Sequence, residues 1–454
     1  MPTTDNTIAV IGLGYIGLPT AVVLAAHGRT VIGVDTSEHK LESINKGELP
    51  FVEAGLDVHL RKVVEDGTLT AQRQTPKADV YIIAVPTPLN SDNGVDVSFI
   101  NDAADAIAPQ LDGGELVILE STSPPGTTDH LAKRVRAARP DLVSDGDLPV
   151  DFAHCPERVL PGRIVEELVT NDRIIGGLSQ AASERAREVY ASFCTGDLLL
   201  TDATTAEMAK LTENSFRDVN IAFANELSLI CDDLGLNVWE LIELANRHPR
   251  VNILQPGPGV GGHCIAVDPW FIVAAAPDSA RLIKTARNVN DKKPLWVLDR
   301  ALRLAKGFEH PTFAVLGLAF KKNIDDLRES PAVEIVKYLS DARTDATLLA
   351  VEPNITELPP MLANRRNIAL SSLDEALANA DIVLLLVDHD EFSEVGDDKV
   401  KGKPVIDTRG QWRPKPSSAT NQQPGKSSAA KETRAAVTDT EPMAMDGASE
   451  PVSA

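Results

Sequence analysis

The chain has 454 residues, 43% of them hydrophobic, so it is long enough for two or three domains with their own cores. Its 66 acidic and 44 basic residues give a net charge of −22, which disfavours nucleic acid or an anionic membrane surface as a partner. Four cysteines lie far apart without a CxxC pair, which argues against disulfides or a bound metal such as zinc. No signal peptide and no apolar run of about 18 residues is recognisable, so we expect a cytoplasmic protein.

A dinucleotide-binding motif opens the chain. A short apolar strand over 8–11 leads into a GxGxxG segment over 12–17, and residues 18–26 have helical composition. A second strand over 30–34 ends at Asp35, where a carboxylate binds the ribose 2′-hydroxyl and repels a 2′-phosphate. The motif therefore predicts NAD rather than NADP as the cofactor. The expected contacts are Gly12, Gly14, Tyr15, Ile16, Gly17 and Asp35.

Further loops of this unit follow predicted buried strands over 80–85 and 116–119. Loops at the carboxyl ends of parallel strands line the ligand crevice, so Thr87, Thr122 and Thr128 are expected to contact the cofactor. Threonine is equally suited to turns and helix caps, and for Thr128 both interpretations stay open.

The segment Pro156-Glu157-Arg158-Val159-Leu160-Pro161-Gly162 follows another predicted strand. Here Glu157 is a candidate general base and Arg158 a candidate anion contact.

One long helix is predicted over 204–231. Lys210, Asn214 and Arg217 recur at intervals of four and three residues, so they share one face of this helix. The row is either the exposed stripe of an amphipathic helix or the lining of a site in which Lys210 donates a charged hydrogen bond.

A glycine-rich loop over 257–262 leads to Cys264. A lone cysteine in such a turn is more often structural than catalytic. If a helix starts just after the loop, its N-terminus would favour the thiolate, and Asp268, one turn onward, could hold a base or a water.

A third unit begins at residue 311 with a strand over 312–316 and a loop that carries Lys321 and Arg328. Its segment 380–387 echoes 78–85, which indicates two related α/β units. The last predicted strand covers 405–407, and the composition beyond about residue 415 predicts a disordered tail.

The motifs GLGYIG, PTP, ESTSPPGTT, PERVLPG, EMAKLTENSFRDVN, GPGVGGHCIAVDP and FKKNIDDLRESP occur in one order along the chain. In this they resemble the UDP-glucose/GDP-mannose dehydrogenase family. The resemblance implies an α/β protein with two Rossmann-like doubly wound domains joined by a central helical region that forms a homodimer. The implied domains are an NAD-binding domain over 1–203, a central helical domain over 204–302 and a UDP-sugar-binding domain over 303–415, followed by the tail over 416–454.

By the same resemblance, Cys264 is the nucleophile that holds a sugar C6 aldehyde between two oxidations, first as a thiohemiacetal and then as a thioester. Lys210 and Asn214 would stabilise the developing alkoxide, an effect typically worth about 3 kcal/mol per donor. Glu157 and Asp268 would act as a base or orient water.

Departures from the UDP-glucose dehydrogenase pattern narrow the resemblance. Val267 stands where those enzymes have a lysine, and Pro161 where they have a second glutamate. Together with His263 and Pro269, these residues look instead like the UDP-N-acetyl-D-mannosamine dehydrogenase subfamily, in which Arg328 would reach the cofactor. The UDP-sugar contacts implied there are Arg158, Val159, Lys210, Asn214, Arg217, His248, Arg250, Gly261, Phe320 and Lys321, and His248 and Arg250 would act across the dimer interface.

Three alternatives stay open. The chain could oxidise another nucleotide sugar, such as UDP-N-acetylglucosamine or UDP-glucose. An epimerase or dehydratase of the short-chain type needs a Tyr-x-x-x-Lys pair, and none of the four tyrosines is followed by lysine at that spacing. A non-catalytic nucleotide-sugar binder would have no need for the full set of Cys264, Lys210, Asn214 and Asp268.

Overall fold

The structure is a computed structural model that describes residues 7–51, 53, 55–90, 94–159, 162–262 and 264–412. The predicted disordered tail over 416–454 lies outside the described residues, as do Pro161 and His263. In the described part of the chain, no helix combines the length and apolar composition that crossing a membrane requires.

Within the described residues, the N-terminal domain is built on an eight-stranded sheet in the order β3-β2-β1-β4-β5-β6-β7-β8. Neighbouring strands are parallel except for the antiparallel pair β6 and β7. The strands are β1 Thr7–Ile11, β2 Thr30–Val34, β3 Leu69–Gln72, β4 Val80–Ile83, β5 Leu116–Leu119, β6 Asp151–His154, β7 Arg173–Gly177 and β8 Leu198–Asp202.

Helices cover both faces of this sheet because alternate residues of each strand point to opposite sides. Ile8 and Val10 of β1 pack into a core with residues of α1, α3, α6 and α7, whereas Ala9 and Ile11 pack into a second core with α4 and α5. The domain is therefore doubly wound, as expected. Its helices are α1 Gly17–Ala26, α2 Glu38–Asn45, α3 Leu56–Glu65, α4 Ser98–Ile107, α5 Thr127–Ala138, α6 Ile164–Thr170 and α7 Gln180–Tyr190.

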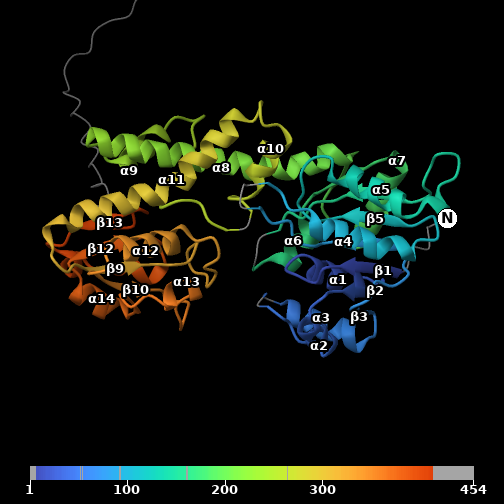
Figure 1. Cartoon of the computed structure of the whole chain (residues 1–454), viewed down its shortest axis with the longest axis horizontal. Helices are drawn as coiled ribbons and strands as arrows, with labels where there is room; N and C mark the ends of the chain where they lie inside the picture. The colour runs from blue at the N-terminus through green and yellow to red at the C-terminus, as the bar shows by residue number, and fades with distance from the viewer. Residues whose placement is uncertain are drawn as a thin grey trace, which may run out of the picture. The chain divides into compact units, whose positions relative to one another are not determined.

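The central region is helical, and its longest element is α8, Ala203–Leu234. The Asp202 side chain caps the N-terminus of α8 by accepting the Thr205 N–H, and Gly235 ends the helix in the left-handed conformation with a φ of 68°. Figure 1 shows α8 running beside α11, against which it packs. The other helices of this region are α9 Val238–Ala245, α10 Asp268–Ala275 and α11 Arg281–Leu304.

The C-terminal domain has a parallel sheet in the order β11-β10-β9-β12-β13. This order matches that of β3-β2-β1-β4-β5, and the turn after the first strand matches as well. The Gly12 N–H donates to the Val34 carbonyl at 2.8 Å, and the Gly317 N–H donates to the Val351 carbonyl at 2.8 Å. The prediction of two related units is confirmed. The elements are β9 Thr312–Leu316, α12 Pro331–Ala342, β10 Thr347–Val351, α13 Pro360–Ala363, β11 Ile368–Leu370, α14 Leu373–Asn379, β12 Ile382–Leu385, α15 Asp397–Val400 and β13 Val405–Asp407.

Two strands are shorter than their apolar runs predict. β4 ends at Ile83 rather than residue 85, because its partner β1 turns away at Gly12, which has a φ of +95°. β12 ends at Leu385 for the same reason, since its partner β9 turns away at Gly317 with a φ of +90°. Periodicity locates a strand, but the neighbouring strand decides where its ladder stops.

Candidate functional site

The glycine-rich loop between β1 and α1 is a tight turn with open space at its centre. A Cβ on Gly12 would lie 2.6 Å from the Ala84 carbonyl oxygen, and one on Gly17 would overlap the Gly12 carbonyl oxygen. A Cβ on Gly14 would meet nothing within 4 Å, and no side chain of the described residues caps α1 at Ile16. The loop thus leaves space for a ligand beside Gly14, in front of the first turn of α1. These features fit the pyrophosphate of NAD.

Asp35 is fixed beside this loop. Its carboxylate accepts the Leu13 N–H at 3.0 Å and the Ser37 N–H at 2.9 Å, and it pairs with Lys40 at 3.0 Å. Burial alone would raise the pKa of Asp35, but these hydrogen bonds and the Lys40 charge hold it below its ordinary value. The carboxylate is therefore ionised and ready to accept hydrogen bonds from a ribose. Tyr15, predicted to contact the cofactor, stacks on Phe51 with ring centroids 4.3 Å apart.

The structure brings two of the three predicted cofactor threonines together. The Thr87 hydroxyl donates to the Thr122 carbonyl at 2.6 Å, and both residues are half-buried. Thr128 is fully buried, and its hydroxyl donates to Glu207 of α8 at 2.6 Å. The hydroxyl of Thr128 thus has a structural partner, and a direct cofactor contact of this residue stays a prediction.

The loop after β6 leads to α6 and contacts α8. Glu157 is buried and pairs with Arg173 of β7 at 3.1 Å, while it also accepts the Arg158 N–H at 2.7 Å. The Arg158 guanidinium pairs with Glu213 of α8 at 2.6 Å. Val159 packs against the core of the first domain. The contacts with Arg173 and with the Arg158 N–H hold the Glu157 carboxylate in place. The role of Glu157 as a base stays a prediction.

The residues of the polar row on α8 differ in burial. Lys210 and Asn214 are half-buried, whereas Arg217 is exposed. The Asn214 amide donates to Asp268 of α10 at 2.5 Å. For Lys210 and Asn214 the geometry therefore favours the site-lining interpretation, and Arg217 lies on the exposed margin of the same row.

Cys264 begins the turn over 264–267 that leads into α10, whose first residue is Asp268. The backbone N–H groups of Val267 and Asp268 donate to the Cys264 carbonyl at 3.1 and 2.9 Å. Cys264 is exposed and Asp268 is buried. Since the charge of Lys210 acts on both of these groups and Asn214 contacts Asp268, the structure gathers the four residues at one place.

The expectation that the helix N-terminus favours the thiolate is wrong. Although one face of Cys264 is open, burial by the surrounding protein raises the pKa of its thiol, and the nearby Asp268 charge raises it further; Lys210 opposes both effects. Burial likewise raises the pKa of Asp268 to about 6, against the Asn214 hydrogen bond and the Lys210 charge. The thiol keeps its proton, and the carboxylate next to it is the group that titrates near neutrality.

We name residues 257–265, which carry Cys264, the cysteine loop. Its glycines allow close packing against the C-terminal domain. A Cβ on Gly261 would lie 2.9 Å from the Phe320 Cβ and overlap the Glu329 carbonyl oxygen. Gly262, at a φ of +84°, faces the Phe320 ring. Two predicted substrate contacts, Gly261 and Phe320, are therefore brought together, and a side chain at Gly261 would separate them.

The remaining predicted residues are Arg328, Lys321, His248 and Arg250. The Arg328 guanidinium carbon is 6.0 Å from the centroid of the Tyr15 ring, next to the dinucleotide loop, and Arg328 pairs with Asp326 at 2.7 Å. Lys321, His248 and Arg250 are exposed. Among the described residues, no hydrogen bond or ion pair joins these three side chains to Cys264, and their substrate contacts stay predictions.

Several buried polar residues were missed by sequence reasoning. Burial and the charge of Glu157 raise the pKa of Glu120 to about 7, and Glu120 accepts a hydrogen bond from Tyr190 at 2.8 Å. Glu207 accepts the Gly126 N–H at 2.5 Å. On α8 and α11, a buried set comprises Asp218, Asn225, Arg287 and Asn290. The only available signal was the seven-residue spacing of Asp218 and Asn225, which places both on one face of α8.

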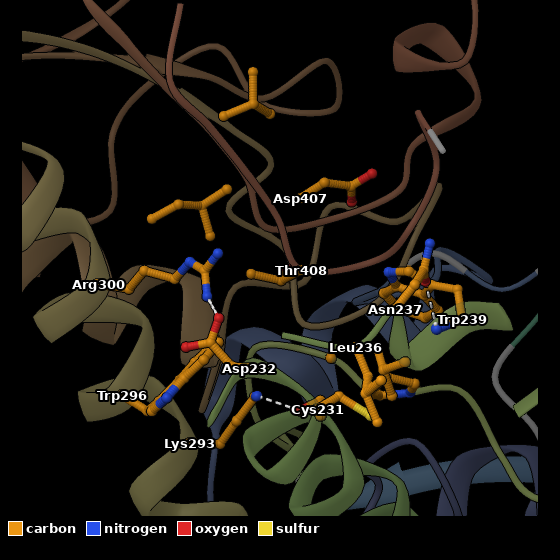
Figure 2. A pocket seen from close by; sticks show the side chains of 16 residues that line it. Cys231, Asp232, Leu236, Asn237, Trp239, Lys293, Trp296, Arg300, Asp407 and Thr408 are labelled. Atoms are coloured by element: carbon orange, nitrogen blue, oxygen red, sulfur yellow. Dashed lines mark hydrogen bonds and ion pairs between the residues drawn. The ribbon is translucent and has the colours of Figure 1, made fainter. Parts of the chain in front are cut away.

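Figure 2 shows a pocket between α8, α11 and the end of β13. Its lining includes Lys293, Trp296, Arg300 and Thr408, together with Gly257 at the start of the cysteine loop. Lys293 is buried, lies over the Trp296 ring at 3.9 Å and donates to Ser228 at 2.5 Å. No predicted site residue lines this pocket. In the described residues there is also no group of three or more His, Cys, Asp or Glu that could hold a metal ion.

A dinucleotide loop with an acid on the second strand, a second Rossmann-like domain, and a cysteine held between them define a dehydrogenase of the NAD-dependent class. The comparisons agree with this class. The sequence matches the NAD binding domain of the UDP-glucose/GDP-mannose dehydrogenase family over residues 6–194, its central domain over 204–292 and its UDP binding domain over 314–414. The chain belongs to this family, and it is an NAD-dependent nucleotide-sugar dehydrogenase.

Similar proteins cover nearly the whole chain. An NDP-N-acetyl-D-galactosaminuronic acid dehydrogenase of Ralstonia nicotianae is 56% identical over 416 residues, which are 90% of this chain and 97% of the relative. A UDP-N-acetyl-D-mannosamine dehydrogenase of Escherichia coli is 53% identical over 419 residues, 90% of this chain and 99% of the relative. The solved UDP-D-ManNAc dehydrogenase of Pyrococcus horikoshii has a TM-score of 0.79 at 39% identity, over 89% of this chain and 96% of that one.

Proposed function

We propose that this chain oxidises the C6 alcohol of UDP-N-acetyl-D-mannosamine in two steps to the carboxylate of UDP-N-acetyl-D-mannosaminuronate. The observation that carries the proposal is the convergence of Lys210, Asn214, Asp268 and Cys264, which supplies hydrogen-bond donors, a base and a nucleophile at one place. NAD, when bound, would take up one hydride in each oxidation, so we expect two NAD to be consumed per sugar. The sugar assignment is supported by the relatives from Escherichia coli and Pyrococcus horikoshii.

Lys210 and Asn214 act on the C6 oxygen. An ammonium and an amide N–H directed at this oxygen stabilise the negative charge that develops when the alcohol loses its proton. Asn214 also donates to Asp268 and so fixes that carboxylate relative to the oxygen. A carboxylate with a pKa of about 6 is largely ionised at neutral pH, and Asp268 can accept a proton there.

Cys264 holds the aldehyde product of the first oxidation. Its thiol adds to the aldehyde carbon, so that the C–S bond forms as the π bond of the C=O group breaks, and the thiol proton passes by way of Asp268 to the C6 oxygen. Since the thiol proton is retained in the free protein, this transfer accompanies the attack rather than precedes it. Oxidation of the thiohemiacetal gives a thioester. Water, activated by Glu157 or Asp268, then breaks the C–S bond, which releases the carboxylate and restores the thiol.

A second candidate substrate is favoured by a specific observation. The Ralstonia nicotianae relative, named for an N-acetylgalactosaminuronic acid product, is 56% identical, slightly more than the mannosamine enzyme of Escherichia coli at 53%. N-acetylmannosamine and N-acetylgalactosamine are both 2-acetamido hexoses, here linked to UDP or NDP, and they differ only in stereochemistry. The spacing of residues in the sequence does not distinguish between them. We retain N-acetylmannosamine, because the Pyrococcus horikoshii structure of that specificity also matches closely.

Substrate choice is tested by NADH formation from equal concentrations of UDP-ManNAc, UDP-GalNAc, UDP-GlcNAc, UDP-GlcNAc with a 2-epimerase, UDP-glucose and GDP-mannose. We expect two NADH per UDP-ManNAc consumed, and activity with UDP-GlcNAc only when the epimerase is present. A larger kcat/KM for UDP-GalNAc would transfer the assignment to the second candidate, and a larger value for UDP-glucose would contradict both.

We further propose that the chain acts in the cytoplasm, where its product supplies the synthesis of a surface polysaccharide or another glycan. The relatives named for an NDP-N-acetyl-D-galactosaminuronic acid and for UDP-N-acetyl-D-mannosamine support this proposal. Deletion of the gene should remove the uronic acid from the surface glycans. Unchanged glycan composition, or enzyme recovered outside the cytoplasm, would contradict the proposal.

The chain also carries a surface suited to a homodimer. Phe216, Phe223 and Ile230 are 70%, 51% and 46% exposed and lie seven residues apart on α8, so they form one apolar stripe. We expect Phe223→Glu to yield a monomer in light scattering, because a carboxylate in the centre of the stripe would be buried unpaired on association. Val58→Glu, at an apolar position of α3 that is 64% exposed, is the control and should leave the dimer intact. A Phe223→Glu dimer would contradict the proposed interface.

A further inference from the structure

A buried ion pair joins the two long central helices. Asp218 of α8 and Arg287 of α11 have no exposed surface, and their side chains approach to 2.5 Å. Asn290, one turn beyond Arg287, donates its amide to the Asp218 carboxylate at 2.8 Å and to the Asp218 carbonyl at 3.1 Å. A second amide, that of Asn225, donates to Asn290 at 2.9 Å. We name these four residues the α8–α11 network.

The network holds the cysteine loop near both of its ends. At the start of the loop, the Asn225 side-chain oxygen accepts the Gly257 N–H at 2.9 Å. At the other end, the Arg287 guanidinium donates to the carbonyl of Ile265 at 3.4 Å. Ile265 directly follows Cys264 in the chain. The same connected set of side chains thus fixes the backbone on both sides of the thiol.

The packing of α8 against α11 does not by itself explain why polar and charged side chains are buried between these helices. Arg287 Nε and one Asp218 oxygen are buried without a hydrogen-bond partner among the described residues, which is costly. A buried ion pair is often no more stabilising than apolar side chains of similar size. What apolar side chains could not supply is the acceptor for the Gly257 N–H and the donor to the Ile265 carbonyl.

The network extends away from the loop to the pocket of Figure 2. The Ser228 hydroxyl donates to the Asn225 carbonyl at 2.5 Å, and the buried Lys293 donates to Ser228. Lys293 and Ser228 each lie three residues beyond Asn290 and Asn225, so the polar contacts continue along the same helix faces. The loop is therefore attached to a row of side chains anchored in both helices.

We propose that the α8–α11 network is a positioning device for Cys264, in which Arg287 and Asn225 set the place of the thiol relative to Lys210, Asn214 and Asp268. The inference rests on the proposed covalent role of Cys264. A misplacement of about 1 Å at a reacting atom can cost about 100-fold in rate, so a fixed loop backbone has a direct effect on turnover.

The test is the double variant Asp218→Asn/Arg287→Gln, which removes both buried charges and leaves only the exposed Asp291 without its ion-pair partner. We expect kcat to fall at least about tenfold while the KM for NAD changes by less than about twofold, since the network contacts the cysteine loop rather than the NAD-binding loop. Alkylation of Cys264 by iodoacetamide without substrate, followed by mass spectrometry of its peptide, should become faster. A loop that leaves its place loses the burial that raises the thiol pKa.

Asn225→Ala removes the acceptor of the Gly257 N–H and so tests the start of the loop. If the double variant does not fold, this variant tests the inference in its place. The control is Asp151→Asn/Arg185→Gln, which removes a pair of 2.9 Å in the NAD-binding domain and should leave kcat and alkylation unchanged. Wild-type kcat in a folded network variant would overturn the inference, as would lost activity with an unchanged alkylation rate. Because alkylation is measured without turnover, it reports the position of Cys264 even if the proposed reaction is wrong.

Discussion

Replacement of Cys264 by serine is expected to abolish formation of the uronic acid, with a loss of at least about 1,000-fold in kcat. A hydroxyl is a far weaker nucleophile than a thiol, so the aldehyde would not be trapped and the second oxidation would lack its covalent substrate. The variant should fold normally, because serine is nearly the same size and Cys264 is exposed. The measurement is NADH per UDP-sugar together with product identification by mass spectrometry.

Cys194→Ser is the matched control for this variant. Cys194 is a half-buried cysteine of the NAD-binding domain whose thiol donates to the Asn171 carbonyl at 3.3 Å, and it has no place in the proposed chemistry. Its replacement should leave kcat within about twofold of wild type, since serine can make the same hydrogen bond. Full turnover in Cys264→Ser would show that the reaction does not use a covalent sulfur intermediate.

The parts of the fold that could be predicted from sequence are those coded locally. Glycine at 12 and 17 is required because any side chain would meet the backbone of the same turn or of Ala84, directly after β4, so the GxGxxG spacing carries the turn with it. Asp35 follows because the second strand of this unit always ends beside that turn. The strand over 30–34 and the last strand over 405–407 were predicted with the bounds that the structure shows.

The site was predicted less completely because its polar contacts join distant segments. The row of Lys210, Asn214 and Arg217 was found, but the neighbouring Asp218 was not, although successive helical residues differ by only about 100° in direction. That rotation carries Asp218 into the interface with α11, where it meets Arg287, 69 residues further on. A helical pattern shows which residues share a face, and only the packed structure shows which face is buried.

Electrostatics was the least predictable feature. A helix after the cysteine was expected to favour the thiolate, but the dipole effect of one helix end is typically below about 2 kcal/mol. Burial and the Asp268 carboxylate raise the pKa of the thiol, against the charge of Lys210. Similarly, Glu157 looked like a free base at a strand end, whereas Arg173, 16 residues later, pairs with it in the interior. Neither outcome follows from local sequence.

Lys210→Met is expected to change both the rate and the pH dependence of the reaction. Loss of the donor to the C6 oxygen should lower kcat by about 100-fold to 1,000-fold. Wild-type activity should fall as the pH drops through about 6, because Asp268 with its raised pKa becomes protonated there and can no longer accept a proton. Since the Lys210 charge lowers the pKa of Asp268, its removal should move this acidic limb to higher pH. The measurement is kcat against pH between 5 and 9.

Asp268→Asn supplies the comparison, since an amide has no proton to gain and its residual activity should lack the acidic limb altogether. The raised pKa also fixes the sign of the linked stability effect: a folded protein that binds this proton more tightly than the unfolded chain gains stability at low pH, and that gain is lost as the pH rises through about 6. Stability and activity therefore respond to Asp268 in opposite directions. An acidic limb caused by unfolding would persist in Asp268→Asn, and its persistence would show that Asp268 is not the titrating base.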